Sequence, residues 1–266
     1  MCISLLSNTQ IPATLPAHIQ VEKKMAQRLG RFRSYTSQPS KAYFSGPKQG
    51  NAYKALLLDA GGTLLQMVQP VEETYAIVGS KHGVKASPSE IKKGFKKAFA
   101  EPWPERLRYQ GDGRPFWRHI VAQATGCASN DYFEELYKHF SQGDAWKLPV
   151  GAYEVLSHLR DAGVKLAVVS NFDTRLRPIL EDMDVAKLFN AIIISSEVGF
   201  EKPAPQIFQV ALDQLNVAAS KTVHIGDDQQ ADKIGAGALG IDSWLWGKDV
   251  HTFKEILHRI LGSDVN

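Results

Sequence analysis

The sequence predicts an α/β fold, in which helices cover a parallel β-sheet and a helical segment is inserted after the first strand. Short apolar runs alternate with amphipathic segments of helix length along most of residues 51–266. Uninterrupted apolar runs are typical of parallel strands whose two faces are both buried. Residues 67–148 interrupt the alternation, because they hold helical patterns but no strand-like apolar run.

Five apolar runs are the expected strands. They cover residues 55–58, 166–169, 191–194, 222–225 and 243–246. Four of them end at polar positions, namely Asp59, Ser170, Ser195 and Gly226-Asp227. Functional groups of open parallel sheets lie at the carboxyl ends of the strands, so these positions are candidates for a common site.

The amphipathic segments are expected to be helices that pack on the sheet. They cover residues 151–162, 173–183, 205–215 and 251–261, with apolar residues at helical spacing. Pro178 lies inside the second segment and is a candidate for a kink. Four further helices are expected in the insert, at residues 72–82, 88–100, 115–125 and 132–140. We interpret the apolar stripes of all these helices as core packing.

These elements divide the chain into three expected parts. Residues 1–50 are expected to be a leader, which consists of a transit peptide followed by a linker. Residues 51–66 and 149–266 form the core domain, and residues 67–148 form the helical insert. A chain of 266 residues is long enough for such a core.

The composition, with 44% hydrophobic and 22% charged residues, is that of an ordinary globular protein. No apolar run approaches the roughly 18 residues of a membrane span, so no membrane association is expected. Residues 1–50 hold 7 of the 31 basic residues and 1 of the 28 acidic ones, which leaves 24 basic and 27 acidic residues elsewhere. A nucleic-acid-binding surface on the folded part is therefore not expected. Cys2 and Cys127 lie far apart, which argues against a disulfide framework.

The basic segment 1–50 is rich in Ser and Thr and lacks the continuous apolar region of a secretory signal. Residues 25–33 are typical of a mitochondrial presequence, and Arg33-Ser34-Tyr35 resembles a matrix-protease site. We therefore expect a mitochondrial protein that is processed near Tyr35 or translated from Met25. A plastid address and a cytoplasmic tail are the open alternatives.

Four separated motifs carry the candidate chemistry. They are Asp59-Ala60-Gly61-Gly62-Thr63-Leu64, Ser170-Asn171, residues 199–208 around Lys202-Pro203, and Gly226-Asp227-Asp228 followed by Asp232. In this order the motifs resemble those of the haloacid dehalogenase-like (HAD) hydrolases, over residues 53–247. The resemblance implies the Rossmann-like HAD fold, of the subfamily in which a helical cap, here residues 67–148, follows the first motif.

The resemblance also implies the roles of the phosphate-binding residues. Asp59 would be a nucleophile that forms an aspartyl-phosphate, because a carboxylate can split phosphoryl transfer into two steps. Lys202 would balance the phosphate charge. Ser170 and Asn171, together with the loop at Gly61 and Gly62, would hold the phosphate oxygens. The expected substrate is a small phosphorylated metabolite.

The same resemblance implies a Mg²⁺ site, since Mg²⁺ binds one or two carboxylates together with phosphate and water. The expected ligands are Asp59, Asp227 and the backbone carbonyl of Gly61. Asp228 and Asp232 are expected either to bind the metal or to support its ligands.

Gly61 stands where phosphatases of the family have a second aspartate, which protonates the leaving group and activates water. A positioned general acid or base contributes about 10²–10⁴-fold to rate. Three outcomes stay open: a substrate with a good leaving group, an acid borrowed from the cap or the substrate, or a non-catalytic binding protein.

Dehalogenases and phosphonate-cleaving relatives also lack this aspartate. The retained acidic residues of the fourth motif favour a metal-dependent phosphoryl site over dehalogenation. A phosphonatase would need a Schiff-base lysine in the cap, where Lys81, Lys92 and Lys96 are available. Arg106, Arg108, Arg114 and Trp117 are candidates for a substrate-facing cap surface.

Overall fold

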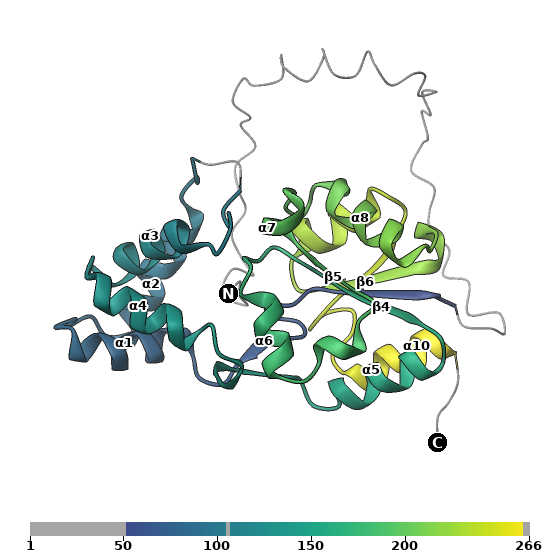
Figure 1. Cartoon of the computed structure of the whole chain (residues 1–266), viewed down its shortest axis with the longest axis horizontal. Coiled ribbons are helices and arrows are strands. Elements are labelled where there is room, and N and C mark those ends of the chain that lie inside the picture. The colour runs from purple at the N-terminus through teal and green to yellow at the C-terminus, as the bar shows by residue number, and fades with distance from the viewer. Residues whose placement is uncertain (1–51, 105–106, 263–266) are drawn as a thin grey trace, which may run out of the picture. The chain divides into compact units, whose positions relative to one another are not determined.

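The computed structural model describes residues 52–104 and 107–262. The predicted leader, Cys2 and Arg106 lie outside the described residues. The centre of the described part is a parallel sheet with the strand order β5-β4-β1-β6-β7 (Figure 1). Its strands are β1 (Ala55–Leu58), β4 (Lys165–Ser170), β5 (Ala191–Ile194), β6 (Thr222–Gly226) and β7 (Asp242–Leu245). Each predicted strand is confirmed to within one residue at either end.

Helices cover both faces of the sheet (Figure 1). One layer consists of α5 (Ala152–Asp161), α6 (Leu176–Asp182) and α10 (Phe253–Leu261), and the other of α7 (Ser195–Val198), α8 (Pro205–Leu215) and α9 (Gly235–Gly237). Side chains alternate along β1, so Leu56 and Leu58 join the core on the α5 side while Leu57 packs with α8. The α/β prediction is therefore confirmed.

Short helical turns join these elements. They are the 3₁₀ turns η3 (Gly143–Ala145), η4 (Ala186–Leu188) and η5 (Ala219–Lys221), and the π-helical turn η6 (Gln229–Ile234). Within the described residues, no helix is long and apolar enough to cross a membrane.

The kink expected at Pro178 is wrong, because α6 starts later than predicted. The helix begins at Leu176, and Asp173 to Arg175 form a turn before it. Pro178 therefore lies in the first helical turn, where a backbone N–H has no intrahelical partner to lose.

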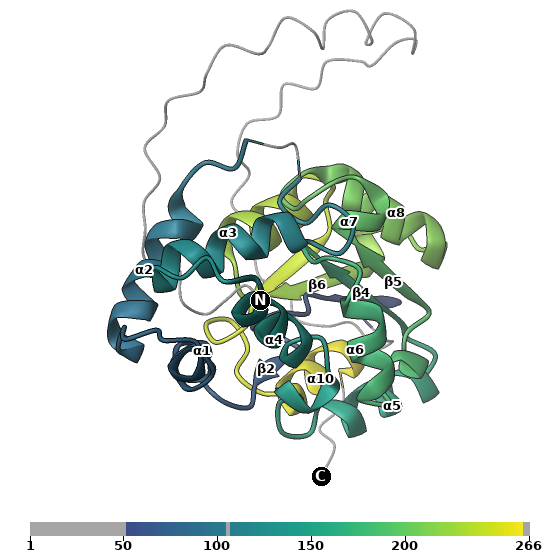
Figure 2. The same ribbon diagram turned by 60° about the vertical axis from the view of Figure 1, so that its left-hand side comes forward.

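Four helices form the insert: α1 (Val71–Lys81), α2 (Pro88–Ala100), α3 (Arg114–Thr125) and α4 (Asn130–His139). Figures 1 and 2 show them grouped together beside the sheet. Helix α2 begins where predicted because Ser87 caps it and forms a capping box with Glu90, and Pro88 occupies the first helical position. The helices pack through aromatic side chains, including Tyr75, Phe95 and Phe99.

Two short strands that the sequence did not predict connect the insert to the core. They are β2 (Gln66–Met67) and β3 (Trp146–Lys147), which pair in antiparallel fashion. The chain therefore leaves the core and returns to it at adjacent points.

Candidate active site

The ends of three neighbouring strands bring the predicted site residues together. Strand β1 pairs with both β4 and β6. Asp59 follows β1, Ser170 is the last residue of β4 and Asp227 follows β6, so the three residues lie at the ends of adjacent strands. Lys202 reaches the same place from the loop between α7 and α8. Asp59 and Lys202, which lie 143 positions apart in sequence, thus belong to one polar cluster.

One oxygen of Asp59 is held by two donors. Lys202 Nζ donates a hydrogen bond to Asp59 Oδ1 over 2.6 Å, and Ser170 Oγ donates to the same oxygen over 3.0 Å. None of the described residues donates a hydrogen bond to the second oxygen, Asp59 Oδ2. Burial raises the pKa of Asp59, while the ammonium of Lys202 opposes this change. The carboxylate is therefore fixed through one oxygen, and the second is left to act as nucleophile or metal ligand.

Lys202 bridges two carboxylates, because its Nζ also donates to Asp232 Oδ1 over 2.6 Å. Burial alone would lower the pKa of Lys202, but Asp232 and Asp59 outweigh this effect and hold the pKa above its ordinary value. The side chain is thus a buried ammonium ion that is fixed against Asp59.

The side chain of Asn171 holds the backbone of Lys202. Lys202 N donates to Asn171 Oδ1 over 2.7 Å, and Asn171 Nδ2 donates to Lys202 O over 2.9 Å. Both ends of the amide are used, so the geometry favours a role in placing Lys202 over the predicted direct contact with phosphate.

Asp232 and Asp228 both have internal partners. Asp232 Oδ2 accepts a hydrogen bond from Asp228 N over 2.9 Å, and Asp232 Oδ1 lies 2.9 Å from His224 Nε2. Asp228 Oδ1 accepts from the backbone N–H groups of Gln230 and Ala231 at the start of η6. Of the two roles left open for these aspartates, their contacts favour support over metal binding.

The pKa of Asp232 reflects these contacts. Burial alone would raise it, but Lys202 and His224 outweigh burial and hold it below the ordinary range. Sequence reasoning missed His224, although a single histidine in the apolar run Thr222–Gly226, two positions before Gly226-Asp227, was a visible signal.

Asp227 lies against the loop that follows β1. A Cβ atom on Gly62 would come within 2.3 Å of Asp227 Oδ2, and Gly62 has a φ of +87°. Only glycine fits this position without strain or displacement. Burial raises the pKa of Asp227 to about 8, and the charges of Asp59 and Asp232 add to the effect. No other described residue donates a hydrogen bond to its carboxylate.

The acidic cluster fits a divalent cation. One oxygen each from Asp59, Asp227 and Asp232 lie within 4.8 Å of one another. Lys202 supplies one positive charge against these three carboxylates, and a divalent ion would balance the rest. Asp59 and Asp227 retain unengaged oxygens of the kind that Mg²⁺ prefers. Gly61 is buried in the same loop, and the role of its carbonyl stays a prediction.

The insert touches the loops that carry the site residues. Arg108 N donates to Glu201 Oε1 over 2.7 Å, next to Lys202. Thr174 N donates to Gly111 O over 3.1 Å, and Trp117 Nε1 donates to Asp173 Oδ2 over 2.8 Å. The insert therefore contacts both the loop after β4 and the loop before α8.

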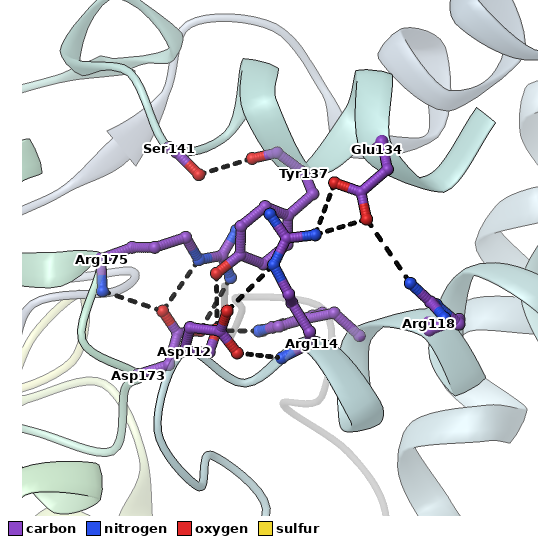
Figure 3. A network of polar contacts seen from close by, with 9 residues as sticks. Asp112, Arg114, Arg118, Glu134, Tyr137, Ser141, Asp173 and Arg175 are labelled. Carbon is purple, nitrogen blue, oxygen red and sulfur yellow. Dashed lines mark hydrogen bonds and ion pairs between the residues drawn. The ribbon is translucent and has the colours of Figure 1, made fainter. Parts of the chain in front are cut away.

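A buried ion pair lies where the insert contacts the loop after β4 (Figure 3). Asp173 is fully buried and accepts hydrogen bonds from Arg175 Nε over 2.8 Å and Arg175 Nη2 over 2.7 Å. The Arg175 guanidinium also lies 4.0 Å from the ring centroid of Tyr137 on α4. An ion pair of the core is thus completed by Trp117 and Tyr137 of the insert.

The candidate cap residues are largely occupied by this junction. Arg114 pairs with Glu134 and stacks 4.1 Å from the Tyr137 ring centroid, and Trp117 is bonded to Asp173. The lysines considered for a phosphonatase lie on the insert surface, where Lys81 pairs with Glu135 and Lys92 with Glu72. These pairs give that alternative no support.

The parallel sheet, the inserted helices and the cluster of aspartates around a lysine define the class of HAD-like hydrolases. A family model described as haloacid dehalogenase-like hydrolase matches residues 53–240. The chain belongs to the haloacid dehalogenase-like hydrolase family.

Curated relatives agree with this assignment. Haloacid dehalogenase-like hydrolase domain-containing protein 3 of Homo sapiens is 32% identical over 203 residues, which cover 72% of this chain and 81% of that protein. Its Bos taurus counterpart is 34% identical with the same coverage. The Rhythmically expressed gene 2 protein of Drosophila melanogaster is 28% identical and covers 73% of this chain and 82% of its own length.

Solved structures show the same fold. A HAD phosphatase from Thermococcus onnurineus has a TM-score of 0.55 at 22% identity, covering 79% of this chain and 98% of its own. The HAD-hydrolase YfnB from Bacillus subtilis, bound to magnesium, has a TM-score of 0.63 at 20% identity and covers 81% and 100%. L-2-haloacid dehalogenase from Xanthobacter autotrophicus has a TM-score of 0.59 at 16% identity and covers 80% and 84%. The fold is thus shared by a phosphatase and a dehalogenase and does not choose between them.

Proposed function

We propose that the protein is a Mg²⁺-dependent phosphatase that acts through an aspartyl-phosphate on a small phosphorylated metabolite. The observation that carries the proposal is the placement of Lys202 between Asp59 and Asp232, beside the unpaired carboxylate of Asp227. A dehalogenase has no need of this excess of negative charge. A phosphatase uses it to hold a divalent ion.

The chain's own residues suggest the order of events. Asp59 Oδ2 attacks phosphorus, the bond from phosphorus to the leaving oxygen breaks, and the leaving group departs with the bonding electrons. Water then attacks the acyl phosphate, which releases inorganic phosphate and restores Asp59. Lys202 faces the developing charge, and Ser170 holds the attacking carboxylate in place. Mg²⁺, held by Asp59 and Asp227, would neutralise phosphoryl oxygens.

The absence of a side chain at Gly61 limits the substrates. Without a general acid, the leaving group must depart unprotonated, so we expect acyl and aryl phosphates to be hydrolysed better than alkyl phosphates. In the same proposal, residues 67–148 act as the cap that determines which of these substrates reaches Asp59.

The alternative is a binding protein that retains the site without turnover, and Gly61 is the observation that favours it. Acetyl phosphate and p-nitrophenyl phosphate, with and without Mg²⁺, distinguish the two functions. We expect wild-type turnover that needs Mg²⁺ and is lost in Asp59→Asn. No turnover and no acid-stable phosphoenzyme in the wild type would favour the binding protein, and metal-independent halide release from a 2-haloacid would favour a dehalogenase.

The variant Gly61→Asp tests the missing acid separately. It should raise activity on alkyl phosphates and change activity on acetyl phosphate much less, because only the alkyl leaving group needs a proton. Melting temperature and Mg²⁺ affinity are measured on the same sample to establish that the loop is intact. An intact variant without any gain on alkyl phosphates would contradict the proposed role of Gly61.

A further inference from the structure

A fully buried histidine lies behind the lysine of the site. His224 is in the middle of β6, and its Nε2 is 2.9 Å from Asp232 Oδ1. The same oxygen accepts the hydrogen bond from Lys202 Nζ. The contacts therefore run without interruption from His224 through Asp232 and Lys202 to Asp59.

The hydrogen bond from His224 has a defined direction. The carboxylate of Asp232 accepts hydrogen bonds on both oxygens, from the Lys202 ammonium on Oδ1 and from Asp228 N on Oδ2, and a carboxylate paired in this way donates none. His224 Nε2 must then carry the hydrogen. Its other nitrogen, Nδ1, is buried without a partner among the described residues, and the ring lies edge-on to Phe208 at 5.0 Å.

Packing alone gives no reason for a histidine at this position. His224 is paired in register with Leu57, which belongs to the apolar cluster under α8. A buried nitrogen without a partner, such as His224 Nδ1, is costly, and an apolar side chain at this position would avoid that cost. The compensating gain must come from the bond to Asp232.

We propose that His224 is a positioning residue of the site. Its Nε2–H holds the Asp232 carboxylate in the orientation that directs Oδ1 at Lys202, and so keeps the ammonium group against Asp59. Without it, the described partners of Asp232 are Asp228 N on Oδ2 and Lys202 itself on Oδ1, so no third group fixes the direction in which Oδ1 meets Lys202. The proposal deepens the proposed function, but it concerns a contact that exists whether or not the site turns over.

Two variants of His224 separate hydrogen bonding from packing. His224→Gln keeps an N–H at about the distance of Nε2 but removes the ring, whereas His224→Phe keeps a ring but removes the N–H. A positioning role predicts a mild effect of Gln and a severe effect of Phe, and a packing role predicts the reverse. His258→Phe on α10 is the matched control, because His258 also has a buried nitrogen without a described partner. His258 lies outside the motifs, in the helical layer of α5 and α10 on the face of the sheet opposite to α8.

The first measurement is the rate at which an amine-reactive acetylating reagent labels Lys202 in the folded protein. Mass spectrometry reads this rate relative to that of the exposed Lys96. Loss of a hydrogen bond to a charged group should raise the rate about tenfold in His224→Phe and by less than about twofold in His224→Gln and His258→Phe. Equal rates in wild type and His224→Phe would overturn the proposal, as would a rise in His224→Gln as large as that in His224→Phe. If His224→Phe does not fold, His224→Leu, which also lacks the N–H and has a smaller side chain, takes its place in both comparisons.

The second measurement is the affinity for orthovanadate in the presence of Mg²⁺, by calorimetry. It should fall about tenfold in His224→Phe and stay near the wild-type value in His224→Gln. A wild type that binds no vanadate would contradict the proposed phosphatase function, while the labelling of Lys202 would still decide the role of His224.

Discussion

The ion pair between Asp173 and Arg175 joins the core to the insert, and Asp173→Asn should weaken the protein strongly. The Asp173 carboxylate accepts four hydrogen bonds: from Arg175 N, Arg175 Nε, Arg175 Nη2 and Trp117 Nε1. An asparagine has one oxygen, so either orientation of its amide places an NH₂ group against two donors. The change also leaves the guanidinium of Arg175 buried without its counter-charge.

The size of the effect follows from the burial of the pair. The side chain of Asp173 is 0% exposed and that of Arg175 is 8% exposed. Removing one partner of a buried ion pair costs about 3–5 kcal/mol. The stacking of Arg175 on Tyr137 is present in both proteins and cancels from the difference. We therefore expect Asp173→Asn to lower the free energy of unfolding by about 3–5 kcal/mol.

Urea unfolding of three related variants provides the assay. Arg175→Met alone should cost a similar amount, and the double variant should cost less than the sum of the two, because no buried charge then remains. The half-exposed pair of Arg177 with Glu197 is the control, and Arg177→Met should cost less than about 1 kcal/mol. An effect of Asp173→Asn no larger than that of Arg177→Met would refute the reasoning.

Three further predictions concern the metal site and the leader. Gly62→Ala should abolish Mg²⁺ binding measured by calorimetry, since its Cβ would displace Asp227. Gly163 is the control, because it has a similar φ of +82° but no atom lies within 4 Å of the position of an added Cβ, so Gly163→Ala should leave binding intact. Equal binding by both variants would contradict the packing argument. The raised pKa of Asp227 means that the folded, metal-free protein holds an extra proton between the ordinary pKa of an aspartate and about 8. The stability of the metal-free protein should therefore fall as pH rises through this window. The affinity for Mg²⁺ should rise up to about pH 8 and then level off, because the metal binds the deprotonated carboxylate. A pH-independent affinity from pH 6 to 8 would argue against this. We propose mitochondrial import on the basis of residues 1–50, and N-terminal sequencing of the mature protein should find a start near Tyr35 or at Met25, whereas retention of Met1 would refute both.

The sheet was predictable because each expected strand is a short apolar run, and four of the five runs end at a polar position. The convergence of Asp59, Ser170 and Asp227 follows from parallel topology together with the position of β1 between β4 and β6. Strands β2 and β3 could not be predicted, because two residues carry no periodicity and the paired residues lie 79 and 81 positions apart. The contact of the Asn171 amide with the backbone of Lys202 could not be predicted for the same reason, because the two residues lie 31 positions apart.

The site also contains relationships that residue types do not encode. A histidine inside an apolar strand is visible in the sequence, but its bond to Asp232 depends on how η6 folds back over β6. Trp117 and Asp173 lie 56 positions apart, and nothing in either neighbourhood indicates that an indole and a carboxylate will meet.

The pairing of β2 with β3 gives the insert the connectivity of a hairpin loop. Gln66 faces Lys147 and Met67 faces Trp146, so the two ends of the insert are fixed next to each other. Antiparallel neighbours can be joined by as few as two residues. An insert of different length or sequence can therefore start and end at the same two points of the core, provided that its contacts with Asp173 and Glu201 are kept or replaced. The part of the molecule that would select substrates is thus a replaceable module, whereas the groups that would perform the chemistry belong to the scaffold.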